Sequence, residues 1–139
     1  MYISKKEIQV SYADTDMMGI IYHANYLKWF ELGRTQLIED VGYSYAEMEK
    51  SGYCAPVLKI EITYKKPIRY GERVMVETWI EENHGLKTTY GYHVVNGEGD
   101  LCAFGTTRHA VVRKDNFKPV QFMKYFPGWF QKYEEIKKK

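Results

Sequence analysis

The sequence predicts one α+β domain, residues 1–139, in which a curved antiparallel sheet wraps around a long helix. The first observation is an apolar helical face near the start of the chain, wide enough to need cover on several sides. The second is a series of segments with alternating apolar and polar residues, separated by turn-forming residues. The third is the length of 139 residues, which suits one domain and leaves no room for two.

The N-terminal part contains the helix around which this fold is organised. Apolar and polar residues alternate over 8–12, which predicts a short strand before the helix. Asn25 is a suitable N-cap for a helix expected over residues 26–41, and Gly42 is expected to end it. A further short helix is expected over residues 44–50.

Gly33 lies on the apolar face of the predicted long helix, in line with Tyr26, Phe30 and Leu37. In a helix, glycine costs roughly 1 kcal/mol relative to alanine. Close packing of a sheet against the helix at this point would explain why glycine stands here.

Four segments in the middle of the chain predict strands: residues 58–65, 74–80, 88–95 and 101–113. Turn-forming residues separate them, and the Asn-Gly pair at 96–97 is the strongest hairpin signal. Consecutive strands with tight connections predict an antiparallel meander. Gly105 is expected to mark a bulge or bend in the last strand.

The C-terminal segment, residues 119–139, is predicted to be helical and is rich in aromatic residues. Pro127 is expected to start or kink that helix. We expect the segment to pack on its own domain. The alternatives are that it covers a sheet edge, contributes to a subunit interface or binds a membrane surface.

Composition excludes several classes of protein. Lys and Arg total 20 against 18 Asp and Glu, and this even balance argues against a nucleic-acid binder. No apolar run is long enough for a transmembrane helix, and the first residues lack the apolar core of a secretory signal. Cys54 and Cys102 are far apart, which argues against a disulfide framework and structural zinc, so a cytoplasmic location is the default expectation.

The candidate chemistry lies just before the predicted long helix. The sequence has no GxSxG, P-loop or HExxH motif, whereas Asp14, Asp16 and His23 are closely spaced there. Free N–H groups at a helix N-terminus can stabilise an oxyanion, and a nearby carboxylate can activate water or attack an acyl carbon. This pattern is suited to acyl hydrolysis.

Each of these residues also has a structural interpretation. Asp16 could stabilise a turn, and His23 could form a hydrogen bond near the helix start. Asp14, Asp16 and His23 could form a hard-metal site, but no further ligand is evident and we expect no metal. Glu31 and Arg34, three residues apart, are expected to form a local ion pair.

The stretch from Tyr12 to Arg34, YADTDMMGIIYHANYLKWFELGR, resembles the signature of hot-dog-fold thioesterases, in particular the 4-hydroxybenzoyl-CoA thioesterase family. The match extends over more than twenty residues, and the order of predicted elements in the rest of the chain agrees with it. One departure is Gly33, where the signature usually has Ala. The resemblance implies a hot-dog fold, a long antiparallel sheet rolled around the helix, and acyl-CoA thioesterase activity without a cofactor.

The resemblance also implies roles for individual residues. Asp16 would be the catalytic carboxylate, acting as nucleophile or general base on the thioester, and the backbone N–H of His23 would polarise the carbonyl. Tyr12 and Tyr22 would line the substrate site, and Asp14 would hold the turn. The family places its active site between two subunits, so a homo-oligomer is implied, either a dimer or a dimer of dimers (a homotetramer).

The phosphates of coenzyme A need cationic partners. Charge near predicted strand ends and turns selects Lys65, Lys66, Arg69 and Lys87 as substrate-binding candidates, and each is equally explained as a solvated surface residue. The sequence does not distinguish acyl-CoA from an acyl carrier protein thioester. Nor does it identify the acyl group.

Two other functions compete with hydrolysis. A non-catalytic module that binds acyl-CoA or acyl carrier protein could use the same pocket, but it would not need a carboxylate facing the carbonyl. A hydratase or dehydratase of the same fold usually needs a His paired with an acid elsewhere, and His23 lies in the thioesterase context instead.

Overall fold

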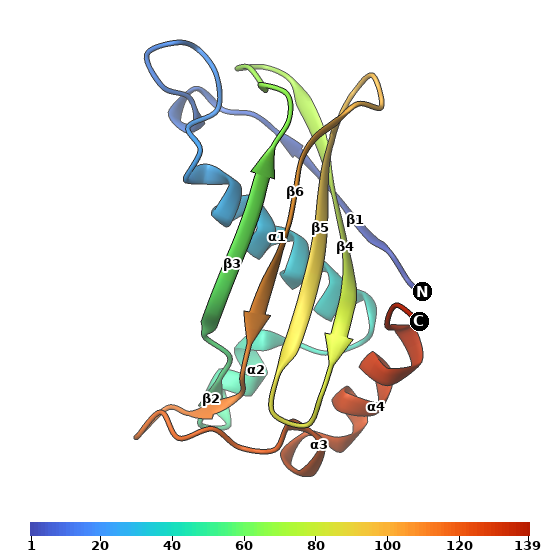
Figure 1. Cartoon of the computed structure of the whole chain (residues 1–139). Helices are drawn as coiled ribbons and strands as arrows, with labels where there is room; N and C mark the ends of the chain where they lie inside the picture. The colour runs from blue at the N-terminus through green and yellow to red at the C-terminus, as the bar shows by residue number, and fades with distance from the viewer.

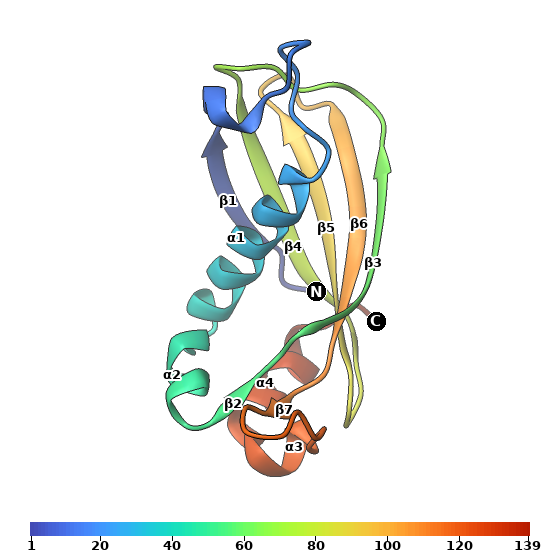
Figure 2. The same cartoon turned by 90° about the vertical axis from the view of Figure 1, so that its left-hand side faces the viewer.

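The computed structural model describes residues 1–139 and places the long helix α1 (Asn25–Asp40) against one face of a five-stranded sheet (Figure 1). The strands are β1 (Ser4–Gln9), β3 (Val57–Tyr64), β4 (Arg73–Asn83), β5 (Thr88–Asn96) and β6 (Leu101–His109). Figure 2 shows the sheet curving around α1, while its other face is not covered by any helix. The predicted α+β architecture, a curved antiparallel sheet around one helix, is confirmed.

The order of strands differs from the predicted meander. The sheet runs β1-β4-β5-β6-β3 with every neighbouring pair antiparallel, so only β4, β5 and β6 form a meander. The connection after β3 crosses the end of the sheet to reach β4 (Figure 1). Ile68 in this connection is fully buried, and its carbonyl accepts a 2.7 Å hydrogen bond from the N–H of Ile21. The connection therefore belongs to the interior and is no hairpin turn.

Helix α1 begins one residue earlier than predicted and lacks the predicted cap. Ala24 is the N-cap and makes no side-chain hydrogen bond, whereas Asn25 is the first helical residue. The Asn25 side chain instead donates to the backbone carbonyl of Asp14 at 2.8 Å. A Cβ on Gly33 would come within 2.9 Å of the Val76 side chain on β4, which confirms the close packing expected there.

The shorter elements agree with the prediction only in part. The first strand lies earlier than predicted, because Tyr12 falls in a 3-10 turn, η1 (Tyr12–Asp14), after β1. The predicted short helix is α2 (Tyr45–Lys50), and the hydroxyl of Ser44 accepts a hydrogen bond from the N–H of Glu47 to cap it. The last predicted strand is divided, because β6 ends and β7 (Val112–Arg113) pairs with β2 (Tyr53–Cys54) instead.

Gly105 does not form the bulge expected from the sequence. It lies in regular register between Ile62 of β3 and Tyr92 of β5. A Cβ at this position would collide with the backbone carbonyl oxygen of Glu61. Glycine is therefore required because the backbones of β3 and β6 approach closely.

The C-terminal segment forms α3 (Phe122–Tyr125) and α4 (Pro127–Ile136), with Pro127 starting α4 as predicted. Trp129 and Tyr133 are buried in the core, which confirms that the segment packs on its own domain. The N–H of Tyr2 donates to the carbonyl of Ile136 at 3.1 Å, so the two ends of the chain meet, as Figure 1 shows. None of the helices combines the length and apolar character that crossing a bilayer requires.

The two edges of the sheet have different surfaces. Strand β1 carries charged side chains that form ion pairs with β4, Lys5 with Glu77 and Glu7 with Arg73. Strand β3 has no neighbour on its outer side and exposes 40 to 51% of each of four apolar or aromatic residues: Val57, Leu58, Ile60 and Tyr64. An unprotected apolar edge of this kind is suited to pairing with another chain.

Candidate active site

Asp14 holds the loop that precedes α1. Its carboxylate accepts hydrogen bonds from the N–H (3.2 Å) and hydroxyl (2.9 Å) of Ser11, and it lies 3.5 Å from the ammonium of Lys28. Its backbone carbonyl accepts from the N–H of Tyr22 at 2.9 Å and from the Asn25 amide. Asp14 is only 5% exposed, so it fixes the loop, as predicted, and does not face a substrate.

Asp16, two residues further on, is half-buried and keeps one carboxylate oxygen free. Its Oδ1 accepts a hydrogen bond from the N–H of Met18 at 2.8 Å, and no donor contacts its Oδ2. The chain reverses at Gly19, whose φ is +76°, and the N–H of Asp16 then donates to the carbonyl of Ile20 at 2.9 Å. This tight turn presents a carboxylate whose orientation is fixed through one oxygen only.

The start of α1 supplies two unused hydrogen-bond donors. The backbone N–H groups of His23 and Ala24 donate to no acceptor in the protein. The carbonyl of His23 accepts a 3.2 Å hydrogen bond from the hydroxyl of Tyr64. The imidazole ring of His23 lies 4.4 Å from the ring of Tyr22, centroid to centroid. Because a helix N-terminus carries partial positive charge, these N–H groups can stabilise a developing oxyanion.

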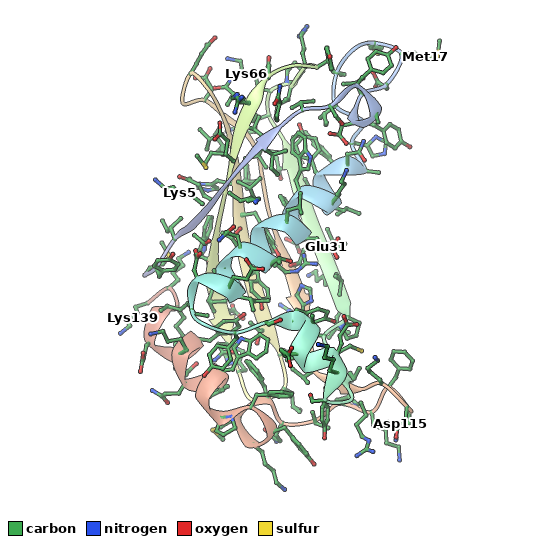
Figure 3. All side chains as sticks on the ribbon, turned by 180° about the vertical axis from the view of Figure 1, so that it is seen from behind. Lys5, Met17, Glu31, Lys66, Asp115 and Lys139 are labelled. Atoms are coloured by element: carbon green, nitrogen blue, oxygen red, sulfur yellow. The ribbon has the colours of Figure 1, made fainter.

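Asp16 and His23 line one cleft of about 350 Å³, which we call the catalytic cleft. Lys65 and Lys66, both predicted from the sequence, line it as well. The Lys66 ammonium is 2.6 Å from the Asp100 carboxylate, whereas Lys65 lies 5.9 Å above the Phe104 ring and has no carboxylate partner. Figure 3 shows Lys66 and Met17 at the same end of the molecule.

The remaining predicted residues lie at increasing distance from this cleft. Tyr22 is beside His23, and Arg69 forms an isolated backbone bridge with Ile20 under the loop without lining the cleft. Tyr12 is 78% exposed and makes an edge contact with the Tyr70 ring. Lys87 lies in the β4–β5 turn at the opposite end of the sheet, so the monomer does not bring it to Asp16.

A second cavity of about 250 Å³, here the distal cavity, lies at the other end of α1. Its walls come from the middle and C-terminal part of α1, from α2, from the starts of β3 and β5, from the end of β6, and from α3 and α4. Most lining side chains are apolar or aromatic, and the titratable exceptions include Glu31, Arg34 and His109. Sequence reasoning missed this cavity because its walls come from separate segments. The only signal was the wide apolar face of α1.

A row of hydrogen bonds runs along one wall of the distal cavity. Arg34 Nη1 donates to the Tyr92 hydroxyl at 3.2 Å, and that hydroxyl lies 2.6 Å from the Thr107 hydroxyl. His109 Nε2 is 2.9 Å from the same Thr107 oxygen, and its Nδ1 is 2.9 Å from the carbonyl of Ala55. Burial, with a smaller contribution from Arg34, lowers the pKa of His109 to about 4. His109 is therefore neutral at pH 7, with its proton on Nδ1.

The ion pair expected between Glu31 and Arg34 is absent. Arg34 donates to Tyr92 on the sheet instead, and Glu31 is exposed without a cationic partner. The expectation failed because spacing along a helix does not reveal that a buried hydroxyl of β5 lies within reach of the guanidinium.

Known proteins share this arrangement of helix, sheet and loop. A family model described as the Thioesterase-like superfamily matches residues 10–130. The chain belongs to this superfamily. Membership confirms the hot-dog fold and the thioester-hydrolase class expected from the Tyr12–Arg34 signature at the level of the family.

Relatives in the superfamily match nearly the whole chain. YneP of Bacillus subtilis (strain 168), which carries the provisional name acyl-CoA thioesterase, is 56% identical over 138 residues, covering 99% of this chain and 100% of that protein. The acyl-CoA thioesterase YbgC of Haemophilus influenzae is 30% identical, covering 84% of this chain and 86% of its own length. The crystal structure of a DHNA-CoA thioesterase from Staphylococcus aureus has a TM-score of 0.95 at 43% identity, covering 97% of this chain and 91% of that one.

Proposed function

We propose that the protein is an acyl-CoA thioesterase that hydrolyses the thioester in the catalytic cleft. The observation that carries the proposal is the presence, in one cleft, of a carboxylate with a free oxygen, Asp16, and an unused N–H at the start of α1, that of His23. Membership of the thioesterase-like superfamily and the names of the relatives support the same reaction.

The two groups divide the reaction between them. A carbonyl oxygen held against the N–H of His23 is stabilised as it becomes an oxyanion. Asp16 either removes a proton from the water that attacks the carbonyl carbon, or attacks it directly to form an anhydride that water then hydrolyses. In both routes the C–S bond breaks, the thiolate of coenzyme A leaves and takes up a proton, and a carboxylic acid is released.

Lys65 and Lys66 are proposed to bind the phosphates of coenzyme A. Both are exposed at the catalytic cleft, where charge-assisted hydrogen bonds to phosphate can form. Lys65 has no carboxylate partner to displace, whereas Lys66 must leave Asp100 or bind phosphate while still paired. Lys65 is therefore the stronger candidate.

A second copy of the chain, paired along β3, is proposed to complete the site. The exposed apolar edge of β3 supports this dimer. Twofold antiparallel pairing of β3 with itself places the start of one strand beside the end of the other. Val57 at the start lines the distal cavity, and Tyr64 at the end bonds to His23. The distal cavity of one copy then opens towards the catalytic cleft of its partner.

A thiol-release assay tests the reaction. The panel comprises acetyl-, hexanoyl-, palmitoyl-, benzoyl-, phenylacetyl- and 1,4-dihydroxy-2-naphthoyl-CoA. We expect Asp16→Asn to lower kcat by at least about 100-fold, because general acid–base groups contribute about 10²–10⁴. Glu135→Gln is the control, since Glu135 is an exposed carboxylate on α4, away from both Asp16 and the β3 edge (Figure 1).

Near-normal turnover by a folded Asp16→Asn variant would contradict the mechanism. Tight binding of acyl-CoA with no thiol release from any substrate, acyl carrier protein thioesters included, would make the protein a binding module instead. A single turnover in ¹⁸O-labelled water distinguishes the two routes, because only the nucleophilic route places the label in the Asp16 carboxylate.

A further inference from the structure

The distal cavity contains a cation that the reaction at Asp16 does not use. We propose that Arg34 determines specificity: its guanidinium selects acyl groups that carry a neutral oxygen, a hydroxyl or carbonyl, beyond the thioester. The proposal rests on the proposed function and concerns the same reaction. It adds the residue that recognises the far end of the acyl group.

Arg34 has hydrogen-bonding capacity to spare. Its guanidinium carries five N–H donors, of which the structure uses one, on the Tyr92 hydroxyl. No carboxylate lies within ion-pair distance of it, and the side chain is half-buried in a mostly apolar wall. Because none of its nitrogens is buried without a partner, the free donors are accessible from the cavity, where a ligand oxygen can accept from them in place of water.

A chain of hydrogen bonds, each with a defined donor and acceptor, holds the guanidinium of Arg34 in place. With the proton of His109 on Nδ1, its Nε2 accepts from the Thr107 hydroxyl. Thr107 then accepts from Tyr92, and Tyr92 accepts from Arg34. The Tyr92 ring is fully buried and stacks on Phe30 at 4.1 Å between centroids, with the ring planes 4° apart. Arg34 is thus preorganised by a rigid partner, and less entropy is lost when a ligand binds.

The volume of the distal cavity limits the acyl group. A cavity of about 150 Å³ holds benzene. At about 250 Å³ the distal cavity can hold a substituted ring, two fused rings or a short chain, and it is too small to enclose a whole palmitoyl chain. Tyr90, Phe122 and Trp129 give it aromatic walls. The Glu31 carboxylate, which also lines this cavity, disfavours an acyl group with a full negative charge and so favours a neutral oxygen.

The experiment compares benzoyl-CoA with 3-hydroxybenzoyl- and 4-hydroxybenzoyl-CoA. We expect the wild type to prefer the better-placed hydroxyl by about 10- to 100-fold in kcat/KM, because a site built to bond an oxygen rejects the analogue without it. Arg34→Met keeps the length of the side chain and should abolish the preference by raising KM for the hydroxylated substrate. The readout is the ratio of kcat/KM between the hydroxylated substrate and benzoyl-CoA, which a general loss of activity would leave unchanged.

Two further variants separate recognition from structure. Arg73→Met is the matched control, because Arg73 is an exposed guanidinium on β4 that pairs with Glu7 outside both cavities. Tyr92→Phe keeps the stacked ring but removes the oxygen that positions Arg34. We expect it to reduce the same kcat/KM ratio. Circular dichroism and sedimentation velocity monitor folding and dimerisation of each variant.

Failure of the inference about Arg34 and failure of the proposed thioesterase function give different results. A wild type that hydrolyses all three substrates equally overturns the inference, as does an Arg34→Met variant that loses activity on all of them in parallel. If nothing is hydrolysed, the proposed function fails, and calorimetric binding of non-hydrolysable phenacyl thioethers of coenzyme A, with and without a ring hydroxyl, tests Arg34 by itself. Equal affinities, or a difference that survives in Arg34→Met, would then overturn the inference.

Discussion

The two ends of α1 form two different kinds of site. The catalytic cleft at its N-terminus is formed by two short segments, residues 16–26 and 64–67, and four of the nine residues that line it are Asp, His or Lys. The distal cavity at its C-terminal half is apolar and consists of segments from all over the chain. Part of the contrast follows from the helix itself, since only its N-terminus offers free N–H groups. In the proposed function, activation of the carbonyl and recognition of the acyl group therefore take place at separate sites.

The separation is too large for one chain to use both sites on one substrate. Arg34 is eleven positions after His23, which at 1.5 Å per helical residue is about 16 Å. A benzoyl group is shorter than this. The proposed pairing along β3 would remove the difficulty, because it would bring the distal cavity of one copy to the catalytic cleft of its partner.

Mixing two inactive variants would test this arrangement and has the largest expected effect. Asp16→Asn disables the catalytic cleft, and Thr35→Trp blocks the mouth of the distal cavity at an exposed helical position. If the sites are shared between copies, a heterodimer has one wholly native site. Unfolding and refolding the two variants together in equal amounts should restore about one quarter of the wild-type activity, from less than about one hundredth.

The control is each variant refolded alone, which should stay inactive. No recovery in the mixture, with heterodimers demonstrated by mass spectrometry, would show that both sites of one chain serve the same substrate. The contrast between the two ends of α1 would then need another explanation.

The second prediction concerns the pH dependence of stability, to which His109 of the distal cavity should contribute. The pKa of His109 is about 4 in the folded protein and about 6.5 when unfolded, so the unfolded chain binds the proton first. His109 therefore contributes stability that is present above pH 6.5 and is lost as pH falls to 4. The loss is about 3 kcal/mol, to be measured by urea unfolding across this range.

His109→Gln should flatten that part of the pH dependence, although the variant is less stable at pH 7. His84→Gln, at an exposed ring 3.4 Å from Glu82, is the matched control and should keep the wild-type profile. Equal pH profiles for His109→Gln and the wild type would contradict the assignment of this stability loss to His109.

The third prediction compares three lysines as binding partners of coenzyme A. Lys65→Ala should raise KM for acyl-CoA by about tenfold, because one charge-assisted phosphate contact is lost. Lys66→Ala should have a smaller effect, since Asp100 already pairs with that ammonium. Lys87→Ala, at the far end of the same chain, should have the smallest effect. An effect of Lys87 equal to that of Lys65 would indicate that coenzyme A binds across the dimer in another direction.

What could be predicted from the sequence depends on how local the information is. Asp16, His23 and α1 were found because a continuous stretch defines them, and alternation located most of β3 to β6. The pairing of β3 with β6 was missed, because the alternating pattern of a strand does not reveal its partner. Without knowledge of the crossover after β3, pairing with the next strand, β4, was the simplest expectation. Arg34 was assigned the wrong partner for the same reason, since Tyr92 lies 58 residues away.

The contact between the two ends of the chain has a consequence for synthesis and folding. Trp129 and Tyr133 fill part of the core from the last helix, and Ile136 holds the backbone of Tyr2. During translation the first strand and α1 emerge long before these side chains are available. A chain growing from its N-terminus therefore cannot close its core until α4 appears. Folding must wait for these long-range contacts, and a nascent chain exposes apolar surface that a chaperone can bind.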